Sequence, residues 1–160
     1  VRRKLEIDTY AYNNLMDLLA TGQVTAFAER LQAFLHNSTS FHQTGPRRAE
    51  VFYDGFMLGL SSTLAQYYGI ESERESGFGR ADAILIPMVE HGDQAIIMEY
   101  KVGPDVASLA KVAEEGLTQI SAKQYSTVLK AHSHVKRALQ VCLAFCGKEM
   151  ALKYAEATLA

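Results

Sequence analysis

The sequence predicts a mixed α/β domain, with a central β-sheet flanked by helices and an extra helical segment before it. In the first third of the chain, apolar residues recur at the three- and four-residue spacing of helices. From Ile70 onward they follow the spacing of strands, and a second helical stretch interrupts those strands. A length of 160 residues with 48% hydrophobic residues and 3 Pro suits one globular domain of this class.

The first third is expected to be helical. The extra helical segment is predicted over residues 8–45, with a break between its helices at Thr21 and Gly22. The second of these helices is indicated by an apolar stripe, Phe27, Leu31, Phe34 and Leu35. A longer helix is expected over residues 47–68, where apolar residues keep the same rhythm and Gly69 provides an end.

Three strands are expected next, paired as a hairpin or meander. A short segment covers residues 70–75, an apolar run covers 81–89, and a third strand covers 94–102 after a polar turn. Gly77 to Gly79 is interpreted as a bend, because it lacks the further residues of a phosphate-binding loop.

The second half adds one helical stretch and one buried strand. Pro104 begins a helix that is predicted to reach Leu129, with a break near Gly116. The apolar run 138–145 is expected to be a buried strand. The final residues, 149–160, fit either a helix by propensity or an edge strand by context.

Residues 1–160 are therefore expected to form a single domain, with a core over residues 47–160. Since the chain begins at Val1, we expect it to be part of a longer protein. It contains no apolar run long enough to cross a bilayer and no signal-peptide pattern, so a cytoplasmic location without a membrane partner is expected. Cys142 and Cys146 lie in an apolar segment and are expected to be reduced and buried.

Candidate catalytic residues stand at the ends of two predicted strands. Glu99 and Lys101 are two positions apart, so their side chains share one face while Tyr100 points to the other. If the polar turn lies near residue 91, antiparallel pairing places Asp82 opposite this pair. Charges at the ends of core-forming strands are rarely tolerated unless they are paired or bind a metal.

Two carboxylates and other oxygen ligands suit a hard cation such as Mg²⁺ or Mn²⁺. The alternative interpretation of these residues is a structural cluster of ion pairs. The net charge of -2 does not favour nucleic acid as a partner, although basic residues are available locally.

Several short motifs in a specific order resemble the PD-(D/E)XK nuclease superfamily. They are Gly79-Arg80-Ala81-Asp82, Glu99-Tyr100-Lys101 seventeen positions after the aspartate, and Gln119-Ile120 with Tyr125 on the following helix. More narrowly, the chain is similar to a bacterial nuclease domain often found C-terminal to a predicted AAA-ATPase-like domain, and to endosymbiont effector nucleases. Ala81 replaces the proline of the superfamily's name. The resemblance implies a restriction-endonuclease-like core.

The resemblance also implies roles for individual residues. Asp82 and Glu99, with the backbone carbonyl of Tyr100, would hold Mg²⁺ or Mn²⁺, and Glu50 would complete the metal shell directly or through water. Lys101 would orient or help deprotonate the attacking water. Three further residues would support the site or contact phosphate, Arg80, Gln119 and Tyr125.

The implied activity is hydrolysis of phosphodiester bonds by an endonuclease, with DNA favoured over RNA as the substrate. An inhibitor or cognate partner protein is a further expected partner, and delivery into a host cell is expected if the chain belongs to an effector or toxin. The alternative function is a catalytically weak or inactive module of the same fold that binds a protein partner or nucleic acid.

Overall fold

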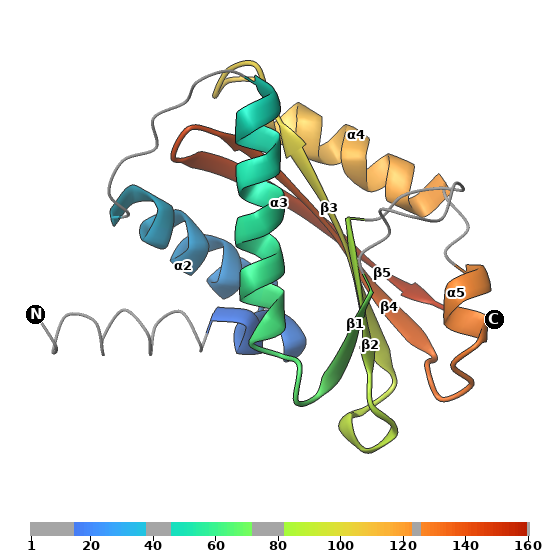
Figure 1. Cartoon of the computed structure of the whole chain (residues 1–160). Coiled ribbons are helices and arrows are strands. Elements are labelled where there is room, and N and C mark those ends of the chain that lie inside the picture. Colours follow the sequence, from blue (N-terminus) through green and yellow to red (C-terminus); the bar gives the residue numbers. More distant parts are fainter. Residues whose placement is uncertain (1–14, 38–45, 72–81, 123–125, 160) are drawn as a thin grey trace, which may run out of the picture.

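The computed structural model describes residues 15–37, 46–71, 82–122 and 126–159. Residues 15–20 are helical. The other described helices and strands are α2 (Val24–Asn37), α3 (Pro46–Ser62), β1 (Tyr68–Glu71), β2 (Ala83–Pro87), η1 (Val89–His91), β3 (Gln94–Val102), α4 (Leu109–Ala122), α5 (Ser126–Lys130), β4 (Arg137–Cys146) and β5 (Glu149–Thr158). The predicted α/β class with a mixed sheet is confirmed (Figure 1).

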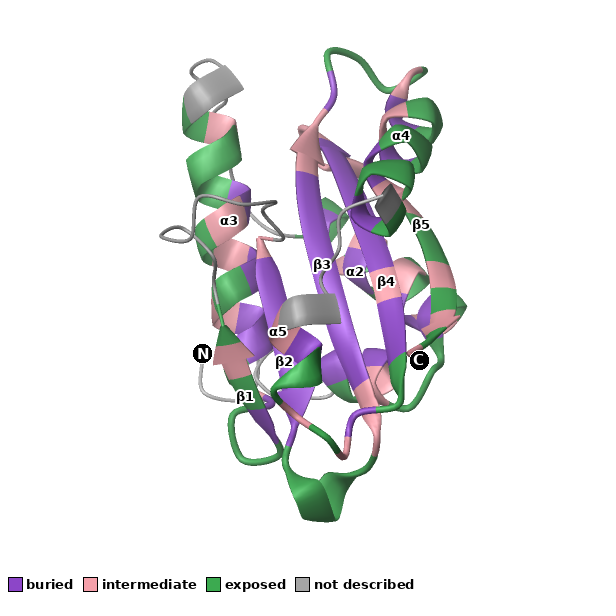
Figure 2. Cartoon of the chain, turned by 90° about the vertical axis from the view of Figure 1, so that its right-hand side faces the viewer, coloured by how far each residue is buried: buried purple, intermediate pink, exposed green. Residues whose placement is uncertain are grey.

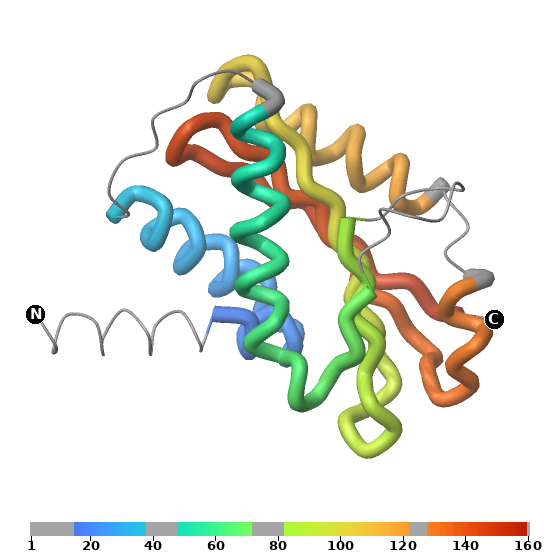
Figure 3. Tube along the Cα trace, in the orientation of Figure 1, coloured from blue at the N-terminus to red at the C-terminus, as the bar shows by residue number. Residues whose placement is uncertain are grey.

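The five strands form one sheet in the order β1-β2-β3-β4-β5. The first three form the predicted antiparallel meander. β4 then pairs in parallel with β3, and Figure 3 follows the crossover between them through α4 and α5. β5 returns antiparallel to β4 through a turn in which Gly147 has a φ of 59°. The positive φ explains the choice of glycine at this turn.

One face of the sheet is covered by α2, α3 and the helical residues 15–20. Side chains from all three helices and from alternate positions of β2, β3 and β4 form one apolar core. Tyr53 of α3 stacks on Phe145 of β4, with ring centroids 4.2 Å apart, and its hydroxyl donates a hydrogen bond to the Gly147 carbonyl. The N-terminal helices are therefore packed as part of the main core.

The other face of the sheet is covered by α4 and α5. Ile84, Ile97 and Cys142 from three neighbouring strands pack there with Ile120 and Leu129 from the two helices. Figure 2 shows β2, β3 and β4 buried along almost their whole length, as expected for central strands covered on both faces. This second face also holds the candidate catalytic pair.

Several element bounds differ from those predicted, and α4 begins at Leu109 rather than at Pro104. α3 ends at Ser62, and a turn rather than a helix leads to Tyr68, where β1 begins. α4 continues through Gly116, where a break was predicted, because the glycine side of the helix packs closely against the sheet. Residues 149–158 form an edge strand, since pairing with β4 satisfies their backbone hydrogen bonds.

Both cysteines are free thiols, as predicted; Cys142 is buried, whereas Cys146 is only half-buried at the end of β4. Within the described part of the chain, none of the helices has the length and apolar character needed to span a bilayer.

Candidate active site

Glu99 and Lys101 form a close ion pair on the α4 side of β3. Lys101 Nζ lies 2.8 Å from Glu99 Oε1. The Glu99 side chain is 5% exposed, whereas that of Lys101 is 34% exposed. The carboxylate is thus held inside the protein, and the ammonium group that binds it reaches the surface.

Asp82 lies immediately before β2, next to the same part of β3. Its backbone N–H donates to the Met98 carbonyl at 3.0 Å, and its Oδ2 accepts a hydrogen bond from the Tyr100 N–H at 2.6 Å. The aspartate side chain therefore continues the hydrogen-bonding ladder beyond the end of β2. Since Ala83 pairs with Met98, the register brings Asp82 beside Glu99.

Burial and neighbouring charge make Asp82 a weaker acid than usual. Desolvation raises the pKa of Asp82 to about 6, the Tyr100 N–H lowers it, and the charges of Asp54 and Glu99 raise it. Lys101 partly offsets these charges. Asp82 is thus repelled by two other carboxylates, an arrangement that a bound cation would stabilise.

The pKa of Lys101 also departs from its ordinary value. Burial lowers it, but the hydrogen bond and charge of Glu99 outweigh burial, so that the pKa of Lys101 is raised. Lys101 is consequently protonated near neutral pH. On the neighbouring strand β4, Cys142 pairs in register with Glu99. Burial together with the Glu99 charge raises the pKa of the Cys142 thiol to about 12.

Two of the other candidate residues are exposed on helices, and two lie outside the described part of the chain. Glu50 is exposed in the first turns of α3, and Gln119 is exposed on α4. Arg80 and Tyr125 lie outside the described residues.

Asp54, one helical turn beyond Glu50, acts electrostatically on both Asp82 and Tyr100. The sequence reasoning missed it, although its place in α3 next to the buried Tyr53 was a usable signal.

The chemistry of these donors fits a hard divalent cation. Among the described residues, no three His, Cys, Asp or Glu side chains are arranged so that they alone could hold a metal. A carbonyl oxygen is an equally suitable ligand. In a strand, the N–H and C=O of one residue point to the same edge, so the Tyr100 carbonyl faces the edge where Asp82 binds the Tyr100 N–H. Asp82, Glu99 and this carbonyl form an oxygen-only set.

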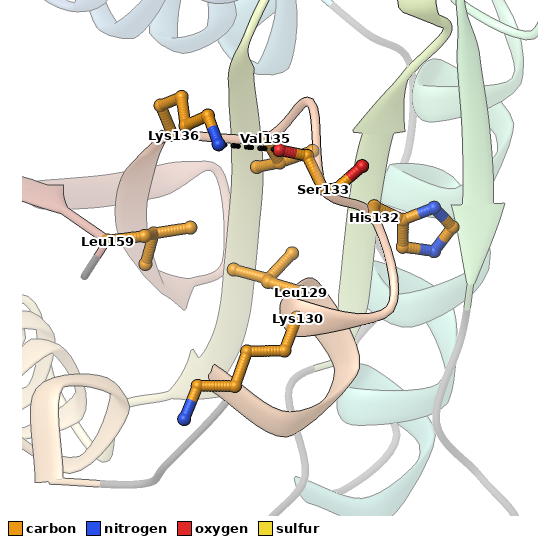
Figure 4. Close-up of a pocket in the computed structure, with 7 residues that line it drawn as sticks. All are labelled: Leu129, Lys130, His132, Ser133, Val135, Lys136 and Leu159. Atoms are coloured by element: carbon orange, nitrogen blue, oxygen red, sulfur yellow. Dashed lines mark hydrogen bonds between the residues drawn. The ribbon is translucent and has the colours of Figure 1, made fainter.

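A cavity of about 290 Å³ lies away from these residues, where β4 begins (Figure 4). Its lining is Leu129, Lys130, His132, Ser133, Val135, Lys136 and Leu159. Because β3 and β4 are parallel and begin together, this cavity is at the opposite end of β3 from Lys101. It contributes none of the candidate catalytic residues.

The raised pKa of Asp82 predicts a pH-dependent stability of the metal-free protein. The folded state binds this proton more tightly than the unfolded chain, whose carboxyl has an ordinary pKa of 3.8. The contribution of Asp82 to the free energy of unfolding should therefore be greatest below pH 3.8 and fall as pH rises to about 6.

Denaturant unfolding of wild type and Asp82→Asn across this pH range, in a chelator, measures the difference. The variant has no titratable group at position 82. As pH rises from 3.8 to about 6, the free energy of unfolding of the wild type should therefore fall relative to that of the variant. Parallel curves for the two proteins would contradict the prediction.

Comparison with known proteins gives a family match that contains the whole candidate pair. A family model described as the PD-(D/E)XK nuclease superfamily matches residues 48–155, well over half of the chain. No curated protein matches significantly. A solved structure titled "Crystal structure of SSO0001" has a TM-score of 0.37 and 17% identity, covering 96% of this chain and 67% of that chain. A likeness at this TM-score carries no argument about the fold or the site.

Proposed function

We propose, from the premise that this chain belongs to the PD-(D/E)XK nuclease superfamily, that it is a metal-dependent nuclease that hydrolyses phosphodiester bonds in DNA. Members of this superfamily typically hydrolyse phosphodiester bonds and generally use divalent metals. The observation that carries the proposal is the buried Glu99 carboxylate, bound to Lys101 and next to Asp82 at the adjoining strand end.

Asp82 and Glu99 would hold Mg²⁺ or Mn²⁺ together with the Tyr100 carbonyl. When bound, such an ion polarises a phosphoryl oxygen and lowers the pKa of its water, which permits hydrolysis near neutral pH. The chain's own contribution is to keep the Glu99 carboxylate rigid, since it is almost fully buried, and to hold Asp82 through the Tyr100 N–H. Both acids are thus fixed before substrate binds.

Lys101 would act as a hydrogen-bond donor and a positive charge. Its raised pKa keeps it protonated, so it is suited to orient the attacking water and to offset the developing charge of the phosphate. Glu99 restrains the ammonium group at one side, while the partly exposed end of Lys101 stays accessible to substrate.

Contacts farther along the nucleic acid are assigned to other residues. Gln119, exposed on α4, is proposed to contact the phosphate backbone, as are Arg80 and Tyr125. Glu50 is proposed to act on the metal through water. An inhibitor or cognate protein partner, an ATPase-linked setting and delivery into a host cell as an effector or toxin also remain proposals.

Incubation of the purified protein with plasmid DNA and labelled oligonucleotides tests the function. Cleavage is expected with Mg²⁺ or Mn²⁺ and should stop when a chelator is added. DNA binding measured under the same conditions identifies the alternative, a module that binds without cutting. If no substrate is cut at millimolar Mg²⁺ or Mn²⁺ while DNA is still bound, the alternative replaces the nuclease.

Asp54 and Glu50 should differ in their effect on the metal. We expect Asp54→Asn to weaken Mn²⁺ binding by about 10- to 100-fold, the usual range for residues that support metal ligands. Asp54 acts on Asp82, whereas Glu50 is exposed one turn away, so the matched Glu50→Gln should have a smaller effect. Calorimetric titration with Mn²⁺ compares the two. A larger loss for Glu50→Gln would show that Glu50 supports the metal more strongly than Asp54 does.

A further inference from the structure

We propose that Gly116 of α4 is a positioning residue: its lack of a side chain lets α4 lie against Cys142 and the stem of Lys101, which keeps the ammonium of Lys101 at Glu99. The effect on catalysis rests on the proposed nuclease function. The packing of Gly116 against Cys142 and Lys101 is independent of that function.

Gly116 lies unusually close to one neighbouring atom, the sulfur of Cys142. A Cβ added to Gly116 would lie 2.3 Å from the Cys142 Sγ, a distance that real Cβ atoms do not show. The same Cβ would lie 3.5 Å from Cys142 Cβ and 3.5 Å from Lys101 Cγ, both ordinary van der Waals contacts. A single sulfur atom therefore decides which residue position 116 accepts.

The backbone conformation does not require glycine at this position. Among the described glycines, positive φ values occur at Gly22, Gly92 and Gly147, while Gly116 lies in the middle of α4. Glycine in a helix interior is less favourable than alanine because it loses more conformational freedom on folding. The close approach of α4 to β4 is thus the physical reason for this residue.

The same contact bears on Lys101. Its long side chain has several rotatable bonds, and α4 limits the space open to its stem at Cγ. Glu99 holds the other end through the 2.8 Å contact with Nζ. Moving α4 outward would release the stem, and a displacement of about 1 Å in a catalytic group can cost about 100-fold in rate.

The test is a double-mutant cycle on the purified protein. Gly116→Ala should lower kcat by about 100-fold with little change in KM, and should lower Tm. Cys142→Ala removes the obstructing sulfur, so Gly116→Ala/Cys142→Ala should regain both Tm and most of the lost kcat. The double variant should also give a nuclear Overhauser contact between the methyl group introduced at position 116 and the Lys101 Hγ protons, as the 3.5 Å distance requires.

Gly55→Ala is the matched control, because a Cβ added to this helical glycine of α3 would meet nothing within 4 Å. It should leave kcat unchanged and should not lower Tm. The proposal is overturned if Gly116→Ala cuts as fast as wild type, or if the double variant is no better than Gly116→Ala. If the wild type itself does not cut DNA, the nuclease function fails, while Tm and the methyl contact still decide whether Gly116 positions Lys101.

Discussion

Replacing Asp82 with alanine is expected to abolish both divalent-metal binding and cleavage. Asp82 supplies one of the two carboxylates of the proposed metal site and is fixed by the Tyr100 N–H. Removing it leaves Glu99 bound to Lys101, which is a poor site for a cation. Since loss of a residue that only supports a ligand already costs about 10- to 100-fold in affinity, loss of the ligand should exceed this.

Titration calorimetry with Mn²⁺ and a plasmid-nicking assay on the same preparation measure both properties. Asp93→Ala is a suitable control, because Asp93 lies before β3 at the far end of the strand and pairs with Arg137 at 2.8 Å. That variant should bind Mn²⁺ and cut like the wild type. Undiminished Mn²⁺ affinity in Asp82→Ala would remove Asp82 from the metal site.

Replacing Lys101 with alanine should have a different outcome, loss of cleavage with metal binding kept. A protonated lysine offers no lone pair to a cation, so it is not a ligand. Its loss should lower kcat by about 10²- to 10³-fold, the range for a donor that stabilises developing negative charge. Mn²⁺ affinity should stay the same or rise, since the variant lacks the positive charge that competes for Glu99.

Lys111→Ala provides the control for a lost positive charge. Lys111 is on the exposed side of α4, with a side chain 80% exposed, and its pairing with Glu115 at 3.9 Å is of the weak surface kind. Both lysine variants should bind Mn²⁺ at least as well as the wild type, but only Lys111→Ala should cut at the wild-type rate. If Lys101→Ala cuts as fast as the wild type, the role given to Lys101 is wrong.

Local patterns in the sequence were sufficient for most of the architecture. Strand periodicity predicted the meander and the buried fourth strand, because central strands bury apolar side chains. A register shifted by one residue would turn these side chains to the other face of the sheet. The same two-residue period placed Glu99 and Lys101 on one face, and the structure brings Asp82 to them. Element ends were less accurate, since α3 stops at Ser62 where the predicted helix extended to residue 68.

What the sequence determined by itself was the class of fold, the family resemblance and the shared face of Glu99 and Lys101, since each depends on local periodicity or on the order and spacing of motifs along the chain. Only the tertiary structure showed that Asp54 acts electrostatically on Asp82, because this depends on how α3 is rotated against the sheet. The contact of Gly116 with Cys142 likewise joins residues 26 positions apart and requires the packed distance between α4 and β4. Residues 149–158 form a strand rather than a helix because the edge of β4 was available to pair with them.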